Sequence, residues 1–144
     1  MPKFSETSKT RLNTAHRDLQ TIFKHVILEY DCTVICGTRD REDQEKAYNE
    51  GKSKVHYPYS KHNHSPSLAV DVAPYEQTGI DWSREQCLDF AGYVKGVADC
   101  LYRIGSITHR IRRGIDWNND NDIDDNTFDD IVHFEIILNE NEKK

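Results

Sequence analysis

Two short segments of this chain place imidazole and carboxylate side chains beside runs of apolar residues. The first contains His62 and His64 and ends, after an apolar run, in Asp71. The second contains Asp130 and, three residues later, His133, again with apolar neighbours. Two imidazoles and one carboxylate can fill three positions around zinc and leave the fourth open, as in catalytic zinc sites. The remaining carboxylate can serve as a general base, so these residue types indicate a hydrolytic zinc centre.

Hydrophobic periodicity and capping residues predict the elements that must position these side chains. The predicted helices cover residues 8–30, 41–50 and 84–101. The predicted strands cover residues 33–38, 68–73, 107–113 and 131–138. Pro74 should end the second strand. Helices and strands in this irregular order predict an α+β fold, a small domain whose antiparallel sheet is flanked by helices and whose strands carry the zinc site.

Composition indicates a globular protein, and a length of 144 residues suits one domain over residues 1–144. Charged residues make up 31% of the chain and no apolar run approaches a membrane span, so we expect no membrane insertion. The net charge of −6 argues against a nucleic-acid binder. The first six residues lack the apolar core of a signal peptide, which favours a cytosolic protein or one released by another route. We expect a monomer.

An acidic segment before the last predicted strand carries oxygen-bearing side chains at alternate positions. These residues are Asp116, Asn118, Asp120, Asp122 and Asp124. The spacing approximates an EF-hand calcium loop, but Thr127 occupies the position of the usual bidentate Glu. Two interpretations stay open: a calcium site and a solvated acidic turn. Bound calcium would order the loop and so position Asp130 and His133 just downstream.

The order of the motifs resembles a known family. The chain contains Ser-x-His, then Ala-x-Asp-x-x-Pro, then Asp-x-x-His-x-Glu, and this order resembles the M15 family of zinc peptidases. The likeness extends over residues 34–137 and includes three further segments, at 37–44, 80–82 and 114–117. The family includes D-Ala-D-Ala carboxypeptidases and dipeptidases and small phage endolysins that cut the L-alanyl-D-glutamate bond of peptidoglycan. The chain is most similar to the endolysins, and the resemblance implies a Hedgehog/D-Ala-D-Ala peptidase-like fold.

The resemblance implies roles for individual residues. It implies a zinc ion held by His62, Asp71 and His133. Asp130 lies where the family places its catalytic carboxylate, and Arg39 matches an arginine that binds the substrate carbonyl or carboxylate. With zinc bound, the carboxylate would accept the proton of the attacking water and pass it to the leaving amine.

The first zinc ligand is where the chain departs from the family pattern. His62 lies nine positions before Asp71, where the family usually has seven, and His64 would restore seven. We favour His62 because it keeps the Ser-x-His context of Ser60, which could hydrogen-bond the substrate; His64 stays the alternative. Glu135, on the same strand face as His133, could hold an imidazole N–H.

The predicted function is a zinc-dependent endopeptidase of bacterial peptidoglycan, a phage lysis enzyme. Such an enzyme would accumulate in the host cytoplasm and reach the cell wall after release through a holin pore. Two alternatives remain: a D-Ala-D-Ala carboxypeptidase or dipeptidase, and a non-catalytic metal-binding module that binds the wall. Asp130 argues against the second alternative, because a binding module has no need of a catalytic carboxylate.

Overall fold

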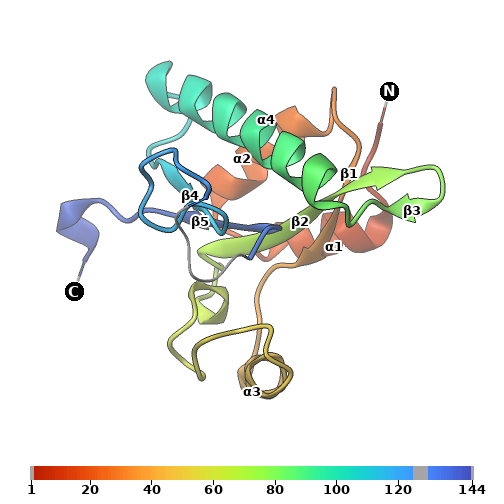
Figure 1. Cartoon of the computed structure of the whole chain (residues 1–144). Helices are drawn as coiled ribbons and strands as arrows, with labels where there is room; N and C mark the ends of the chain where they lie inside the picture. Colours follow the sequence, from red (N-terminus) through yellow and green to blue (C-terminus); the bar gives the residue numbers. More distant parts are fainter. Residues whose placement is uncertain (1, 125–129, 144) are drawn as a thin grey trace.

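A four-stranded antiparallel path forms the centre of the computed structural model, which describes residues 2–124 and 130–143 (Figure 1). The strand order is β1-β2-β5-β4, and β3 extends the sheet by pairing with β2. The strands are β1 (Cys32–Cys36), β2 (Ala69–Glu76), β3 (Gly79–Ile80), β4 (Ile111–Arg113) and β5 (His133–Ile136). The helices are α1 (Glu6–Asn13), α2 (Arg17–Val26), α3 (Arg41–Asn49) and α4 (Arg84–Arg103), with short 3-10 turns η1 (Lys61–Asn63) and η2 (Glu140–Glu142). The α+β class predicted from the sequence is confirmed.

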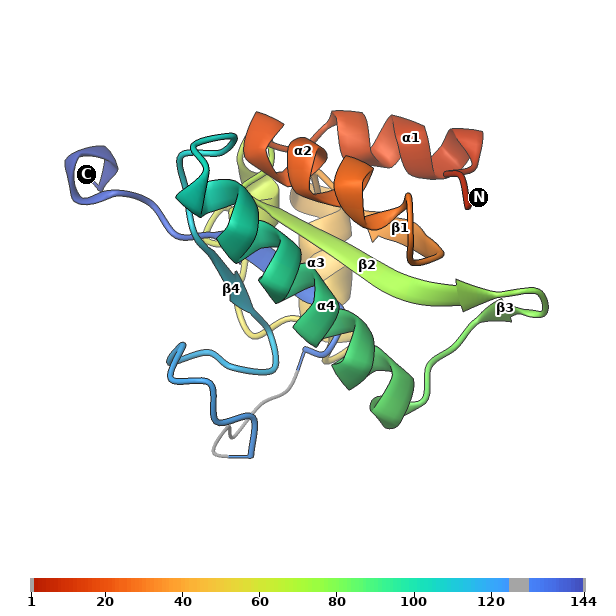
Figure 2. The same cartoon turned by 90° about the horizontal axis from the view of Figure 1, so that it is seen from above.

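The helices α2 and α4 cover one face of the sheet, and α3 lies on the opposite side (Figures 1 and 2). Phe23 of α2 and Phe90 of α4 meet Phe134 of β5 in edge-to-face contacts, with ring centroids 5.4 and 6.1 Å from Phe134. All three rings are buried, and each stabilises the fold by about 2–3 kcal/mol. This core fixes β5, and with it the strand position of His133. None of the helices in the described ranges is long and apolar enough to cross a membrane.

The helix predicted over 8–30 is in fact two helices, α1 and α2. Between them the chain pairs with a distant segment: the His16 N–H donates to the Ser67 carbonyl (2.8 Å), and the Ser67 N–H donates to the Thr14 carbonyl (2.9 Å). His16 then caps α2, because its Nδ1 accepts the Asp18 N–H (2.9 Å). Ala15 at the break is still buried, so apolar residues continue at helical spacing across it and conceal the interruption.

Strand β2 continues past Pro74, where the sequence predicted its end. The Tyr75 N–H donates to the Asp31 carbonyl on the β1 side (3.0 Å), so the Pro74 nitrogen faces the other edge. On that edge β5 pairs only with residues 69–71, so no β5 acceptor faces this nitrogen. Strands β4 and β5 are also shorter than predicted. Helices α3 and α4 and strand β1 lie close to their predicted positions, with Asp40 and Ser83 as N-caps.

Candidate metal centre and active site

The side chains of His62, Asp71 and His133 converge on one point from η1, β2 and β5. His62 Nε2 lies 3.2 Å from Asp71 Oδ1 and 3.3 Å from His133 Nδ1, and His133 Nδ1 lies 3.3 Å from Asp71 Oδ1. All three residues are buried. The structure therefore brings together the three residues for which the sequence predicted zinc binding, and it leaves His64 exposed and outside this group.

Backbone pairing explains why these three side chains meet. The antiparallel register of β2 and β5 places Asp71 directly opposite His133. His62 is held by a capped turn: the Ser60 hydroxyl accepts the His62 N–H (3.1 Å), and the Asn63 side chain accepts the Ser60 N–H (3.0 Å). Ser60, which the sequence predicted as a substrate contact, thus holds the turn, although it also lines the adjacent pocket.

The outer nitrogen of each imidazole has a hydrogen-bond acceptor. His62 Nδ1 donates to the Gly37 carbonyl (2.8 Å), and His133 Nε2 donates to Glu135 Oε1 (2.8 Å). These bonds leave His62 Nε2 and His133 Nδ1 as lone-pair donors that face Asp71. Four ligand atoms around a tetrahedral zinc lie about 3.3 Å apart, which matches the separations within this group. The residues present therefore fit a zinc ion with three protein ligands.

The charges of the group also suit a cation. Burial alone would raise the pKa of Asp71, but the neighbouring imidazoles outweigh burial and hold that pKa well below its usual range. Burial alone would likewise lower the pKa of His62, yet Asp71 raises it to about 10. Positive charge at this point is thus strongly favoured. A bound metal ion would supply this charge and displace any proton from the two inner nitrogens.

Asp130 lies beside this group, with Oδ2 3.8 Å from His133 Nδ1. Its position depends on Gly114, because the Asp130 N–H donates to the Gly114 carbonyl (2.9 Å) and the Gly114 N–H donates to the His133 carbonyl (2.8 Å). A Cβ atom at position 114 would lie 2.0 Å from the Asp130 carbonyl oxygen. Burial and the negative charge of Asp71 raise the pKa of Asp130 to about 6. A carboxylate with this pKa is suited to exchange protons near neutral pH.

A pocket of about 500 Å³ opens over the group and is lined by basic, aromatic and reactive side chains. Arg39 lies on its wall, where its guanidinium contacts Asp71 Oδ2 (3.4 Å) and donates to Gln44 Oε1 (3.1 Å). The pocket and the group beneath it therefore combine three potential metal ligands, a carboxylate that could act as a base and a guanidinium that could stabilise an oxyanion. This is the combination needed to hydrolyse an amide bond.

The structure adds contacts around His133 that were not predicted from the sequence. The Trp117 ring packs against His133, with centroids 5.4 Å apart. Lys61 and Arg112 both contact Glu135, at 2.9 and 2.7 Å. Arg112 lies opposite Glu135 in the β4–β5 pair, a cross-strand relation that only the register reveals.

The acidic segment forms a turn whose side chains bind its own backbone. The Asp116 carboxylate is buried, accepts the N–H groups of Asp120 (3.2 Å) and Asn121 (2.8 Å), and faces Arg113 (3.5 Å). The carboxylates of Asp120 and Asp122 each accept the N–H two residues later. Thr127 lies outside the described residues. Calcium binding by this loop stays a prediction.

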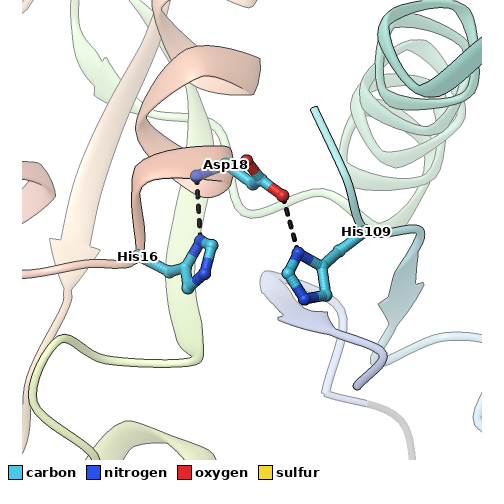
Figure 3. A group of neighbouring side chains, drawn as sticks. All are labelled: His16, Asp18 and His109. Carbon is cyan, nitrogen blue, oxygen red and sulfur yellow. Dashed lines mark hydrogen bonds and ion pairs between the residues drawn. The ribbon is translucent and has the colours of Figure 1, made fainter. Parts of the chain in front are cut away.

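A second group of two histidines and an aspartate lies at the junction of α2 and the segment before β4 (Figure 3). Asp18 Oδ2 contacts His109 Nδ1 (2.7 Å), and the other ring nitrogen of His109 contacts Glu142 of η2 (2.8 Å). From the sequence, His16 and His109 are expected to be surface residues, which is wrong for His109. His109 is buried, and its ring packs edge-on against His16 at 5.0 Å.

Comparisons with known proteins agree with this geometry. The model of the phage L-alanyl-D-glutamate peptidase family matches residues 1–137. The L-alanyl-D-glutamate peptidase of Escherichia phage T5 is 29% identical over 125 residues, which cover 85% of this chain and 87% of the relative. The fold is similar to the crystal structure of the Serratia marcescens L-Ala D-Glu endopeptidase ChiX (TM-score 0.69, 19% identity, 94% and 91% of the two chains covered). The endolysin-type resemblance of the motifs is thus confirmed, and the chain belongs to the phage L-alanyl-D-glutamate peptidase family.

Proposed function

We propose that this protein is a zinc-dependent endopeptidase that hydrolyses the L-alanyl-D-glutamate bond of bacterial peptidoglycan. The observation that supports zinc most directly is the 3.2–3.3 Å spacing of His62, Asp71 and His133, with both outer imidazole nitrogens hydrogen-bonded elsewhere. Membership of the peptidase family supports the bond that is cut. Asp130 and Arg39, on the same pocket, supply the remaining groups that the reaction needs.

The roles follow from position and charge. Zinc held by the three ligands would supply a Lewis acid that acidifies water and polarises the scissile carbonyl. Asp130 accepts the proton of the attacking water and donates it to the leaving amine, a function that its place beside the proposed zinc ligands allows. Arg39 is held by Asp71 and Gln44, so its guanidinium is preorganised to stabilise negative charge on the carbonyl oxygen.

The biological setting follows from the same proposal. The cell wall is the substrate, and the enzyme acts as a lysis protein that accumulates in the host cytoplasm and reaches the wall after holin-dependent release. We further propose that residues 1–144 act as one peptidase domain and as a monomer. The predictions that the chain inserts into no membrane and binds no nucleic acid belong to this proposal.

Digestion of purified peptidoglycan tests the function. Mass spectrometry of the products should show new L-Ala carboxyl ends and D-Glu amino ends, which disappear with a chelator and return with zinc. Asp130→Asn should lower the rate by about 10²–10⁴-fold with zinc content unchanged, whereas the exposed, distant Glu85→Gln should match the wild type. Release of terminal D-Ala would instead identify a carboxypeptidase, and no cleavage by zinc-loaded protein would favour a binding module.

A further inference from the structure

Glu135 lies behind His133 and is almost fully buried. One of its oxygens, Oε1, accepts the N–H of His133 Nε2 at 2.8 Å. The other, Oε2, contacts two cations, Lys61 Nζ at 2.9 Å and Arg112 at 2.7 Å. A buried carboxylate is costly unless it is compensated, so these two cations are what allow a carboxylate to remain at this position.

Arg112 differs from Lys61 because it contacts both supports of the His133 ring. Its second terminal nitrogen donates to the Trp117 carbonyl (3.2 Å), and its guanidinium lies 5.5 Å from the centroid of the Trp117 ring. Trp117 in turn packs against the ring of His133, and Glu135 accepts a hydrogen bond from the Nε2 atom of that ring. The Arg112 guanidinium therefore connects Trp117, which packs against the imidazole of His133, to Glu135, which accepts a hydrogen bond from that imidazole.

Lys61 reaches the same carboxylate from the turn that carries His62, and its ammonium also donates to the Ile136 carbonyl of β5. The Lys61 stem thus connects the turn to the strand, whereas the Arg112 guanidinium supports the imidazole of His133. A guanidinium is planar and donates to two acceptors in fixed directions, a geometry that an ammonium on a flexible stem does not reproduce.

We propose that Arg112 is a positioning residue that holds the imidazole of His133 in its metal-binding orientation through Glu135 and Trp117. This inference rests on the proposed function, because it assumes that zinc is the ligand of His133. Both arginines line the pocket, but Arg39 contacts the proposed ligand Asp71 directly, whereas Arg112 reaches His133 through Glu135 and Trp117. The competing role for Arg112 is direct binding of a substrate carboxylate from the pocket wall.

Zinc affinity and steady-state kinetics separate the two roles. Arg112→Met should weaken zinc binding, measured by competition with a chromophoric chelator, by about 10–100-fold, the usual effect of losing an outer-shell partner. Arg112→Lys should give an intermediate loss. With zinc saturating, KM for soluble wall fragments should stay within about twofold of the wild type. Unchanged zinc affinity together with a raised KM would overturn the proposal and assign Arg112 to substrate binding.

The matched control is Arg110→Met, two residues earlier, because Arg110 contacts Asp99 and Tyr102 away from the pocket. It should leave zinc affinity unchanged. In a Glu135→Gln background, Arg112→Met should add little further loss, because the contact through which it acts is already weakened. A full additional loss there would contradict the proposed route. If wild type binds zinc but cuts no wall fragment, the proposed function fails, while the zinc measurements still decide the role of Arg112.

Discussion

Two groups in this protein use the same residue types, and their spacing differs. In the first group, His62 Nε2, Asp71 Oδ1 and His133 Nδ1 lie 3.2–3.3 Å from one another, so a single ion could contact all three atoms. In the second group, Asp18 and His109 are only 2.7 Å apart. The shorter distance is that of a charge-assisted hydrogen bond, whereas the longer ones match the edges of a zinc coordination tetrahedron.

The second group is arranged to hold a proton. Both ring nitrogens of His109 face carboxylates, Asp18 on one side and Glu142 on the other (2.8 Å), so the ring donates two hydrogen bonds as an imidazolium. His16 Nδ1 is engaged with the backbone N–H of Asp18 (Figure 3). Both ring nitrogens of His109 and the Nδ1 of His16 thus have partners of their own, whereas His62 Nε2 and His133 Nδ1 both face Asp71 Oδ1. The second group connects α2, the segment before β4 and η2 through its hydrogen bonds. The first group is arranged to bind a ligand.

The largest expected difference between the groups is in zinc binding. His62→Ala should lower zinc affinity by about 10³-fold and abolish wall hydrolysis, because one of three protein ligands is lost. His109→Ala should retain one zinc per chain with wild-type affinity. Metal analysis after dialysis against a weak chelator measures both. Two zinc ions per wild-type chain, one of them lost in His109→Ala, would break the comparison by showing that the second group also binds metal.

The second expected difference is in stability. Asp18→Ala removes the acceptor of His109 Nδ1 and of the Thr108 N–H (3.0 Å), and the buried His109 imidazole then loses this carboxylate partner. We expect unfolding to become easier by about 3–5 kcal/mol, as measured by urea denaturation. Glu140→Ala, which removes an exposed ion pair with Lys143 in the same C-terminal segment, should cost less than about 1 kcal/mol. Equal effects of the two variants would mean that the buried group contributes no more to the free energy of unfolding than an exposed ion pair does.

The smallest expected effect is a pH dependence of the second group. Burial would lower the pKa of His109, but its hydrogen bonds with Asp18 and Glu142 raise it overall, while the pKa values of both carboxylates are lowered. The contribution of His109 is complete below its unfolded pKa of about 6.5 and is lost as pH rises through the higher folded value. The contribution of the two carboxylates to stability is complete above about pH 4.5 and is lost on acidification.

The difference in unfolding free energy between wild type and His109→Gln should therefore be largest near pH 5.5 and smaller at pH 9. Both proteins share the first group, so its titration cancels in the difference. The titratable groups that face His109 include the imidazole of His16, whose own pKa is lowered by burial. Chemical denaturation at the two pH values measures the change. A difference that grows toward pH 9 would show that His109 is bound as the neutral ring.

The sequence predicted much of the first group because its residues lie in short, ordered motifs. Asp71 and His133 each lie within an apolar run, and the strands that these runs form determine their mutual position through one register. The choice of His62 over His64 followed from the neighbouring Ser60, which the structure places as the cap of the turn. The assignment of these residues as zinc ligands remains a proposal.

The second group could not be predicted, since its members are far apart in the chain and no motif links them. His109 meets Asp18 and Glu142 only after α2, the segment before β4 and η2 have packed together. The break between α1 and α2 was hidden for a related reason: Ala15 is buried on the same side as its helical neighbours, so periodicity continues where hydrogen bonding stops. Tertiary contacts decide such features, and local patterns do not report them.

The close approach at Gly114 has a consequence for the tolerance of this protein to mutation. The residue carries no reactive group, yet even the methyl group of alanine would meet the Asp130 carbonyl oxygen at 2.0 Å and the His133 Cβ at 2.9 Å. Any larger side chain must push apart Asp130, the proposed base, and His133, a proposed zinc ligand. In a library of all single substitutions, position 114 would therefore be as intolerant as the catalytic positions, for a reason that is entirely steric.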